Sequence, residues 1–218
     1  MSAKQYAKAG VDIDAGDAAS SLAGQHAKTT FAGRRGRIGM PAKLPGGYAG
    51  ALDFGDHYVV TCDDGTGTKM AVAEALGEFD TLGYDLAAMV ADDAVCLGAE
   101  VISISNTLDC PHVDKKVIGD LLKGLAKACR EQKIVIPGGE IAEVGSTVNG
   151  LVWNATAIGI VAKKRLLDGS KIRVGDAVIA LQEQGLRSNG FSLARYILTN
   201  AFGTNWHTKK FQGKTWGD

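Results

Sequence analysis

The sequence is poor in aromatic residues and has no excess of either charge. Phe, Trp and Tyr make up only 6% of the 218 residues, and 24 basic side chains balance 24 acidic ones. Binding to nucleic acid or to an anionic membrane relies on excess positive charge, and single-strand binding also uses aromatic stacking platforms. We therefore expect neither nucleic acid nor a membrane among the partners of this chain.

Other common signals are also missing. The four cysteines are far apart and form no C-x-x-C pair, which argues against a zinc site or a disulfide framework and favours reduced thiols in a cytoplasmic protein. The N-terminus has no apolar signal core, and no apolar run is long enough to span a bilayer. With 45% hydrophobic residues, the chain can form one full domain and part of a second.

The stretch from Cys62 to Met70 carries the strongest functional signal. It reads Cys-Asp-Asp-Gly-Thr-Gly-Thr-Lys-Met, between a strand predicted over 57–62 and a helix predicted over 69–76. Glycine lets backbone N–H groups approach an anion, and a helix N-terminus favours negative charge. Because the aspartates would repel a bare phosphate, the pattern predicts Mg²⁺ between carboxylates and phosphate. An ordinary glycine-rich turn is the open alternative.

The N-terminal region is less informative. Apolar and acidic residues alternate from Val11 to Asp14, which predicts a short strand or extended arm over 6–15 with both acids on one side. A solvated N-terminal segment is the alternative interpretation. A short helix is predicted over 18–28, and a long loop rich in Gly, Arg and Pro over 31–50.

A helix predicted over 83–98 contains one unexpected carboxylate. Leu86, Val90 and Leu97 fall on one apolar stripe, and Asp93 interrupts it. A carboxylate that faces a core is costly unless it is paired or bound to a metal. Asp93 is therefore the second predicted metal ligand. A helix rotated so that Asp93 reaches the solvent edge is the alternative.

Strands and helices alternate along the rest of the chain. The predicted elements are strand 100–106, helix 115–132 with Asp114 as its N-cap, strand 134–136, strand 151–161, strand 177–181 and helix 191–198. Charged, turn-like residues after Lys163 predict a boundary between a first domain over 1–163 and an incomplete second domain over 164–218. For the tail over 199–218 we expect an exposed Trp206 and early proteolysis.

Seven motifs occur in an order that resembles the phosphoribosylformylglycinamidine cyclo-ligase (AIR synthetase) family. They lie at 10–16, 64–69, 80–89, 98–100, 138–143, 168–170 and 188–195. The resemblance covers roughly residues 6–198, and the joint order is more specific than any single motif. It implies an α/β (α+β) fold, in which a PurM-like N-terminal domain has a mixed sheet flanked by helices. An incomplete α+β C-terminal domain follows, and two copies would form a homodimer around a shared β-barrel.

The resemblance also implies a reaction. Formylglycinamidine ribonucleotide and ATP give 5-aminoimidazole ribonucleotide, ADP and phosphate in de novo purine biosynthesis. The formyl oxygen is phosphorylated, and the amidine nitrogen then attacks the same carbon. Such a phosphoryl transfer needs positioning and charge neutralisation, which Mg²⁺ and Lys69 would supply. Other PurM-like enzymes, such as amidotransferase synthetases and thiamine monophosphate kinases, and a non-catalytic dimerisation or nucleotide-binding module are the open alternatives.

The resemblance assigns roles to individual residues of this chain. The implied roles are catalysis for Lys69, Asp64 and Arg187; ATP and phosphate binding for Asp12, Asp14, Lys28, Gly65, Thr66, Gly67, Thr68, Lys69 and Glu140; substrate binding for Ser188, Asn189 and Gly190; and metal binding for Asp64 and Asp93. The chain departs from the family where it has Asp63 for Thr, Thr66 for Val, Asp92 for Asn and Arg187 for His. Arginine cannot act as a base at neutral pH, although it binds phosphate well.

Overall fold

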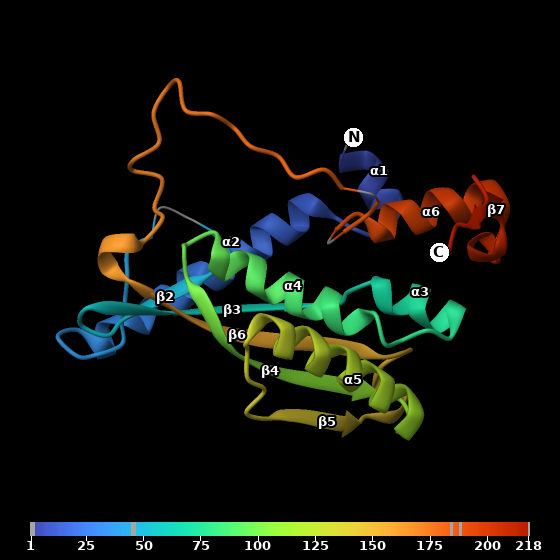
Figure 1. Ribbon diagram of the computed structural model, residues 1–218, viewed down its shortest axis with the longest axis horizontal. Coiled ribbons are helices and arrows are strands. Elements are labelled where there is room, and N and C mark those ends of the chain that lie inside the picture. Colours follow the sequence, from blue (N-terminus) through green and yellow to red (C-terminus); the bar gives the residue numbers. More distant parts are fainter. Residues whose placement is uncertain (1–2, 45–46, 184, 188, 218) are drawn as a thin grey trace.

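A six-stranded mixed sheet is the centre of the fold (Figure 1). The computed structural model describes residues 3–44, 47–183, 185–187 and 189–217. The strands run in the order β1-β2-β3-β6-β4-β5, and every neighbouring pair is antiparallel except β4 and β5. Their bounds are β1 Met40–Pro41, β2 Gly50–Asp53, β3 His57–Gly65, β4 Glu100–Cys110, β5 Gly139–Glu143 and β6 Val152–Ala162. Within the described residues this sheet stays open, so the shared barrel remains an expectation.

Helices cover one face of the sheet. α4 (Leu82–Val95) lies across β3, β4 and β6, α5 (Lys115–Gln132) packs beside α4, and α3 (Lys69–Leu76) continues from the end of β3 (Figure 1). The fully buried core side chains come from the strands and these helices: Val60, Ile104, Trp153, Leu86, Val90, Leu121 and Leu125. The predicted α/β class with a mixed sheet flanked by helices is confirmed.

Glycines allow α4 and α5 to approach each other closely. A Cβ added to Gly83 of α4 would lie 1.9 Å from the amide nitrogen of Leu125. A Cβ added to Gly124 of α5 would lie 1.9 Å from the carbonyl oxygen of Asp80. These distances are far below any van der Waals contact, so a larger side chain at either position would force the two helices apart.

Several predicted elements are confirmed with small changes. The helices predicted over 69–76 and 115–132 have the predicted bounds, and Asp114 accepts hydrogen bonds from the amides of Lys116 and Val117 as the N-cap of α5. The strand predicted over 151–161 is β6, and the one predicted over 100–106 extends to Cys110. The helix predicted over 83–98 ends at Val95.

The strand predicted over 6–15 is wrong. The chain forms α1 (Ala3–Lys8) and α2 (Ile13–Thr29) there, and the helix predicted over 18–28 is the later part of α2. The Asp12 carboxylate accepts a hydrogen bond of 3.0 Å from the amide of Ala15, which makes it the N-cap of α2. The alternation around Asp12 therefore marks a helix start, because aspartate is a favoured N-cap residue. The loop predicted over 31–50 contains the 3₁₀ helix η1 (Phe31–Arg34) and the short β1.

Two further predicted strands are wrong. Residues 134–136 form only an isolated bridge, between Val135 and Ser103, and the 3₁₀ helix η2 (Gly145–Thr147) follows β5. After η3 (Lys163–Arg165), the described residues from 166 to 190 contain no helix or strand, so the strand predicted over 177–181 is not formed. Figure 1 shows this part of the chain as an extended trace that runs away from the sheet and returns beside α1. Leu166 packs against the core, whereas most of the apolar residues after it, such as Ile179 at 87% exposure, face solvent.

The tail is more ordered than the sequence suggested. α6 (Phe191–Phe202) packs against α1, and it is followed by η4 (Trp206–Thr208) and a hairpin of β7 (Lys210–Phe211) and β8 (Lys214–Thr215). Trp206 is buried, contrary to our expectation, because η4 packs against α3. The rings of Phe211 and Trp216 stack with centroids 4.2 Å apart. In the described part of the chain, no helix has both the length and the apolar character needed to cross a membrane.

Candidate functional site

A cavity of about 330 Å³ lies where β3 ends and α3 begins, and we call it the turn pocket. Three parts of the chain form its walls: Tyr6 and Val11 near the N-terminus, Asp64–Lys69 with Met89, and Asn189–Ser192 at the start of α6. The structure therefore brings the predicted phosphate-binding turn next to Asn189 and Gly190, two of the predicted substrate-binding residues. The third, Ser188, lies outside the described residues.

The turn itself is fixed against β6. A Cβ at Gly65 would lie 2.0 Å from the side-chain oxygen of Asn154, so only glycine fits there. The amide of Thr66 donates a hydrogen bond of 3.0 Å to the carbonyl of Trp153, and the Thr66 side chain is buried. The amide of Gly65 donates to the carboxylate of Asp64 at 2.7 Å. Gly67 has a φ of +52°, which favours glycine. These contacts hold the turn in one conformation at the N-terminus of α3.

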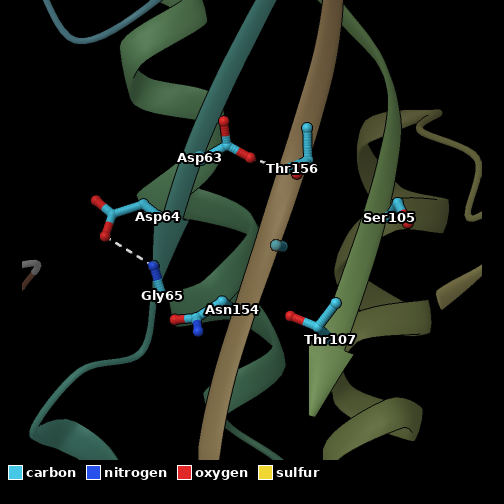
Figure 2. A pocket seen from close by; sticks show the side chains of 8 residues that line it. Asp63, Asp64, Gly65, Ser105, Thr107, Asn154 and Thr156 are labelled. Atoms are coloured by element: carbon cyan, nitrogen blue, oxygen red, sulfur yellow. Dashed lines mark hydrogen bonds between the residues drawn. The ribbon is translucent and has the colours of Figure 1, made fainter. Parts of the chain in front are cut away.

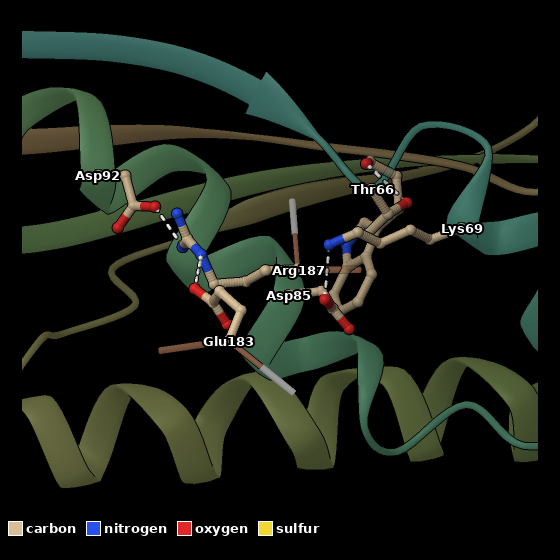
Figure 3. A network of polar contacts seen from close by, with 7 residues as sticks. Thr66, Lys69, Asp85, Asp92, Glu183 and Arg187 are labelled. Atoms are coloured by element: carbon tan, nitrogen blue, oxygen red, sulfur yellow. Dashed lines mark hydrogen bonds and ion pairs between the residues drawn. The ribbon is translucent and has the colours of Figure 1, made fainter. Parts of the chain in front are cut away.

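Lys69 is buried and paired. Its ammonium donates to the carboxylate of Asp85 on α4 at 2.6 Å, with 5% of the lysine side chain and 33% of the aspartate side chain exposed. The Phe191 ring lies 5.5 Å from the same ammonium, and the Thr68 and Ser192 hydroxyls are 3.2 Å apart. Figure 3 shows the Lys69 ammonium turned toward Asp85. Sequence reasoning assigned Asp85 no role, because its distance from Lys69 depends on how α3 and α4 pack.

Two of the departures from the family pattern meet in the structure. The Arg187 guanidinium donates to Asp92 at 2.5 Å and pairs with Glu183 at 3.1 Å (Figure 3). The hydrogen bond from Arg187 to Asp92 and the charge of Asp92 raise the pKa of Arg187 above its ordinary value. Arg187 does not line the turn pocket, so the structure places this predicted catalytic residue in an ion pair that joins the segment before α6 to α4.

The two predicted metal ligands interact but line different cavities. Burial raises the pKa of Asp93, and the charges of Asp64 and Asp92 raise it further. Asp64 lines the turn pocket, whereas Asp93 lines a cavity of about 230 Å³ beside Leu97 and Asp168. The described residues hold no group of three or more His, Cys, Asp or Glu side chains that could bind a metal. Magnesium usually takes one or two carboxylates plus phosphate oxygens, so the pair of acids still suits it.

The remaining predicted nucleotide contacts are spread over the molecule. Asp12 is the N-cap of α2 and Asp14 lies in its first turn. Asp12 follows Val11, which lines the turn pocket. Lys28 is at the opposite end of the same helix, roughly 24 Å away at 1.5 Å per residue. Glu140 lies on the edge strand β5, paired with Thr107. None of these four residues lines the turn pocket of this chain.

A second polar cavity, of about 420 Å³, lies on the face of the sheet opposite the helices (Figure 2). It is lined by Asp63, Asp64, Gly65, Ser105, Thr107, Asn154, Ala155 and Thr156. Asp63 accepts a hydrogen bond from Thr156 across the β3–β6 pair. Asp64 and Gly65 line both this cavity and the turn pocket, so the end of β3 forms the wall between them.

Comparison with known proteins identifies the protein family to which this fold and this turn pocket belong. Residues 46–161 match the family described as AIR synthase related protein, N-terminal domain. This match covers more than half of the chain, which therefore belongs to that family, and the resemblance of the seven motifs is confirmed.

Curated relatives of this chain share a more specific name. The chain is 42% identical over 209 residues to the phosphoribosylformylglycinamidine cyclo-ligase of Thermococcus kodakarensis, covering 96% of this chain and 62% of the relative. It is also 42% identical over 201 residues to the cyclo-ligase of Pyrococcus furiosus, covering 92% and 60%. This chain thus spans about three fifths of the length of these curated relatives. A solved protein from Thermus thermophilus, tt0281, aligns at 17% identity with a TM-score of 0.48, over 56% of this chain and 40% of the other, which is too little to support an argument.

Proposed function

We propose that this chain acts in the ATP-dependent cyclisation of formylglycinamidine ribonucleotide to 5-aminoimidazole ribonucleotide, in the cytoplasm, as a step of de novo purine biosynthesis. The observation that carries the proposal is the turn pocket, where an acid, a glycine turn and a buried lysine face the N-terminus of α6. The cyclo-ligase names of relatives at 42% identity favour this reaction over other ATP-dependent ones. We also propose the division into domains over 1–163 and 164–218, since β6 and η3 end just before a long irregular segment.

The residues of the pocket suit the binding of a polyphosphate. The amides of Gly67 and Thr68 lie at the N-terminus of α3, where backbone N–H groups and the helix dipole favour an anion. Asn189 and Gly190 stand at the N-terminus of α6 and would bind the phosphate end of the substrate in the same way. The two substrates, ATP and formylglycinamidine ribonucleotide, would then bind in the same cavity.

Asp64 and Asp93 would hold Mg²⁺, with Asp64 as the ligand inside the pocket. When bound, Mg²⁺ neutralises the negative charge of the phosphoryl group during transfer. Asp64 is held by its own turn, because its carboxylate accepts the Gly65 amide. Asp92 is already paired with Arg187, which leaves Asp64 and Asp93 to share a cation.

The chain's own contribution to the chemistry is to position the reactants. Attack of the formyl oxygen on the terminal phosphorus releases ADP, and attack of the amidine nitrogen on the formyl carbon then releases phosphate with that oxygen. A phosphoryl transfer of this kind depends on alignment and on neutralised charge. Arg187 is tied to Asp92 and Glu183, so we propose that it fixes the segment that carries Asn189.

A homodimer would complete the site. The face of the sheet opposite the helices exposes Ile102, Ile158 and Ile160, and a second copy would cover them. Lys28 and Glu140, which do not line the turn pocket of their own chain, would then contact a nucleotide only across the interface. Sedimentation at micromolar concentration should show a dimer. A monomer across that range would contradict the proposed interface.

Nucleotide binding tests the site directly. Removal of the Asp64 charge by Asp64→Asn should weaken Mg-ATP binding by about 1–3 kcal/mol, the contribution of a lost charge-assisted contact. Asp93→Asn should weaken it in the same direction. Asp63→Thr is the matched control, because Asp63 lines the other cavity only. Calorimetry with and without magnesium measures all four proteins. Equal affinities, or binding that does not respond to magnesium, would show that the site is elsewhere.

Turnover tests the reaction. Incubation of the chain with formylglycinamidine ribonucleotide, ATP and Mg²⁺ should produce ADP and 5-aminoimidazole ribonucleotide in equal amounts, as measured by chromatography. ADP formation that depends on a different substrate would contradict the assignment while leaving the ATP site intact.

A further inference from the structure

Lys69 lies between two cavities. One is the turn pocket, and the other is a cavity of about 370 Å³ on the far side of the lysine, lined in part by Asp85, Leu186 and Gly217. Lys69 and Phe191 line both cavities, whereas Asp85 lines only the second. Because Asp85 lines only the second cavity, the 2.6 Å ion pair holds the ammonium on that side of Lys69. Figure 3 shows the pair.

The ammonium can leave Asp85 only for another anion. The lysine side chain has only 5% exposure, and an unpaired buried charge strongly destabilises a protein. Asp85 is in a different situation, because a third of its side chain is exposed and water can solvate the carboxylate after the pair opens. The flexible four-carbon stem of lysine allows the ammonium to change partners without movement of the backbone.

We propose that Asp85 is a positioning residue that competes with the ligand phosphate for the Lys69 ammonium, and that Lys69 exchanges Asp85 for phosphate when nucleotide binds. This inference rests on the proposed function, since it takes a phosphate-bearing nucleotide as the ligand of the turn pocket. Asp85 thus lowers the affinity for nucleotide and, in return, keeps a buried charge paired in the free protein.

The test compares Asp85→Asn with the wild type by titration calorimetry against ATP, inorganic triphosphate and adenosine. Loss of the competing carboxylate should tighten ATP and triphosphate binding on the order of tenfold, and should leave adenosine binding unchanged. Without ligand the variant should melt at a lower temperature, and ATP should raise its melting temperature more than that of the wild type. A purely structural role of Asp85 would lower the melting temperature without changing the affinity of the folded protein.

Three variants isolate the effect. Asp120→Asn breaks an exposed ion pair with Lys116 on α5. It should leave the affinities for ATP and for triphosphate unchanged. Asp85→Glu keeps the lysine paired but moves the carboxylate, so it should fold where Asp85→Asn does not, and it should tighten ATP binding by a smaller factor. In a Lys69→Met background, Asp85→Asn should have no effect on ATP affinity, because the shared lysine is gone.

The outcomes separate this inference from the proposed function. Unchanged or weaker ATP binding by folded Asp85→Asn or Asp85→Glu would overturn the partner exchange while leaving the nucleotide site in place. Failure of the wild type to bind ATP and triphosphate would overturn the proposed function, and the exchange with it, before any variant is compared.

Discussion

The strand β3 and the segment after η3 each contain a run of residues that favours a strand, but only β3 forms one. Residues 57–62 and 177–181 are both short runs rich in β-branched and other apolar side chains. The first is hydrogen-bonded between β2 and β6 and covered by α4, whereas the second has no strand beside it among the described residues and is exposed. β-propensity reflects packing against neighbouring strands more than a preference of the backbone, so the same pattern forms a strand only where partners exist. We call residues 166–183 the linking segment.

Limited proteolysis should show the largest difference between the two regions. Trypsin should cut the linking segment at Lys171 and Arg173 on the order of a thousandfold faster than any site within 57–162, because cleavage there needs no opening of the core. Mass spectrometry of the early fragments identifies the sites. First cuts within α5, which carries several lysines, would show that the sheet region is the less stable of the two.

A matched pair of substitutions should separate the regions by stability. Ile104 in β4 is fully buried, and Ile179 in the linking segment is 87% exposed. Ile104→Ala should lower the free energy of unfolding by about 2–5 kcal/mol, since it removes buried methyl groups and leaves a cavity. Ile179→Ala should change it by less than about 0.5 kcal/mol. Urea denaturation measures both, and similar losses would mean that the linking segment is packed in solution.

Thiol reactivity should distinguish the core from its edge. Burial, and then the charge of Asp93, raise the pKa of the Cys62 thiol from an ordinary 9.0 to about 11. A raised pKa keeps the thiol protonated, so at pH 8 the reactive thiolate is about a hundredfold scarcer than for an unshifted group. Iodoacetamide should therefore label the exposed Cys96 first and Cys62 only above about pH 10. Rapid labelling of Cys62 at pH 8 would show that α4 opens readily from β3.

The smallest effect should come from Arg187, which pairs with Asp92 of α4 and with Glu183 at the end of the linking segment. Arg187→His, which restores the family residue, weakens the contact with Asp92. Exposed ion pairs contribute little, so the tryptic cleavage rate in the linking segment should rise by less than about fivefold. Asp92→Asn should give the same increase. A difference between the two variants would mean that Glu183 alone holds the arginine.

Local chemistry made much of the fold and part of the site predictable. Asp114 caps α5 by accepting from the amides of the residues that follow it, and the glycine turn between β3 and α3 is set by residues adjacent in the chain. β3 and β6 were found for the same reason, because their β-branched and apolar residues lie in continuous runs. The turn pocket could be anticipated only in part, since Tyr6 and Val11 reach it through the fold of α1 and α2.

Most of the wrong predictions depend on contacts between residues that are far apart in the sequence. Trp206 is buried by α3, which the tail sequence does not indicate. Residues 134–136 lack a full partner strand, so their apolar run forms one bridge. Asp85 was assigned no role from the sequence, and the packing of α3 against α4 places it 2.6 Å from Lys69. Asp12 was the exception, because its capping role was local and the alternating pattern concealed it.

The glycine contact between α4 and α5 affects how mutational data on this protein should be interpreted. Asp85 follows Gly83 by two residues on α4, so a shift of α4 away from α5 would also move the carboxylate that pairs with Lys69 of α3. Gly124 touches the chain at Asp80, just before α4, and lines none of the cavities around Lys69. A deep mutational scan scored by growth would nevertheless rank Gly124 among the active-site residues. In directed evolution, a substitution at Gly124 could not be compensated at Gly83, because glycine is already the smallest residue and a Cβ there would clash with Leu125.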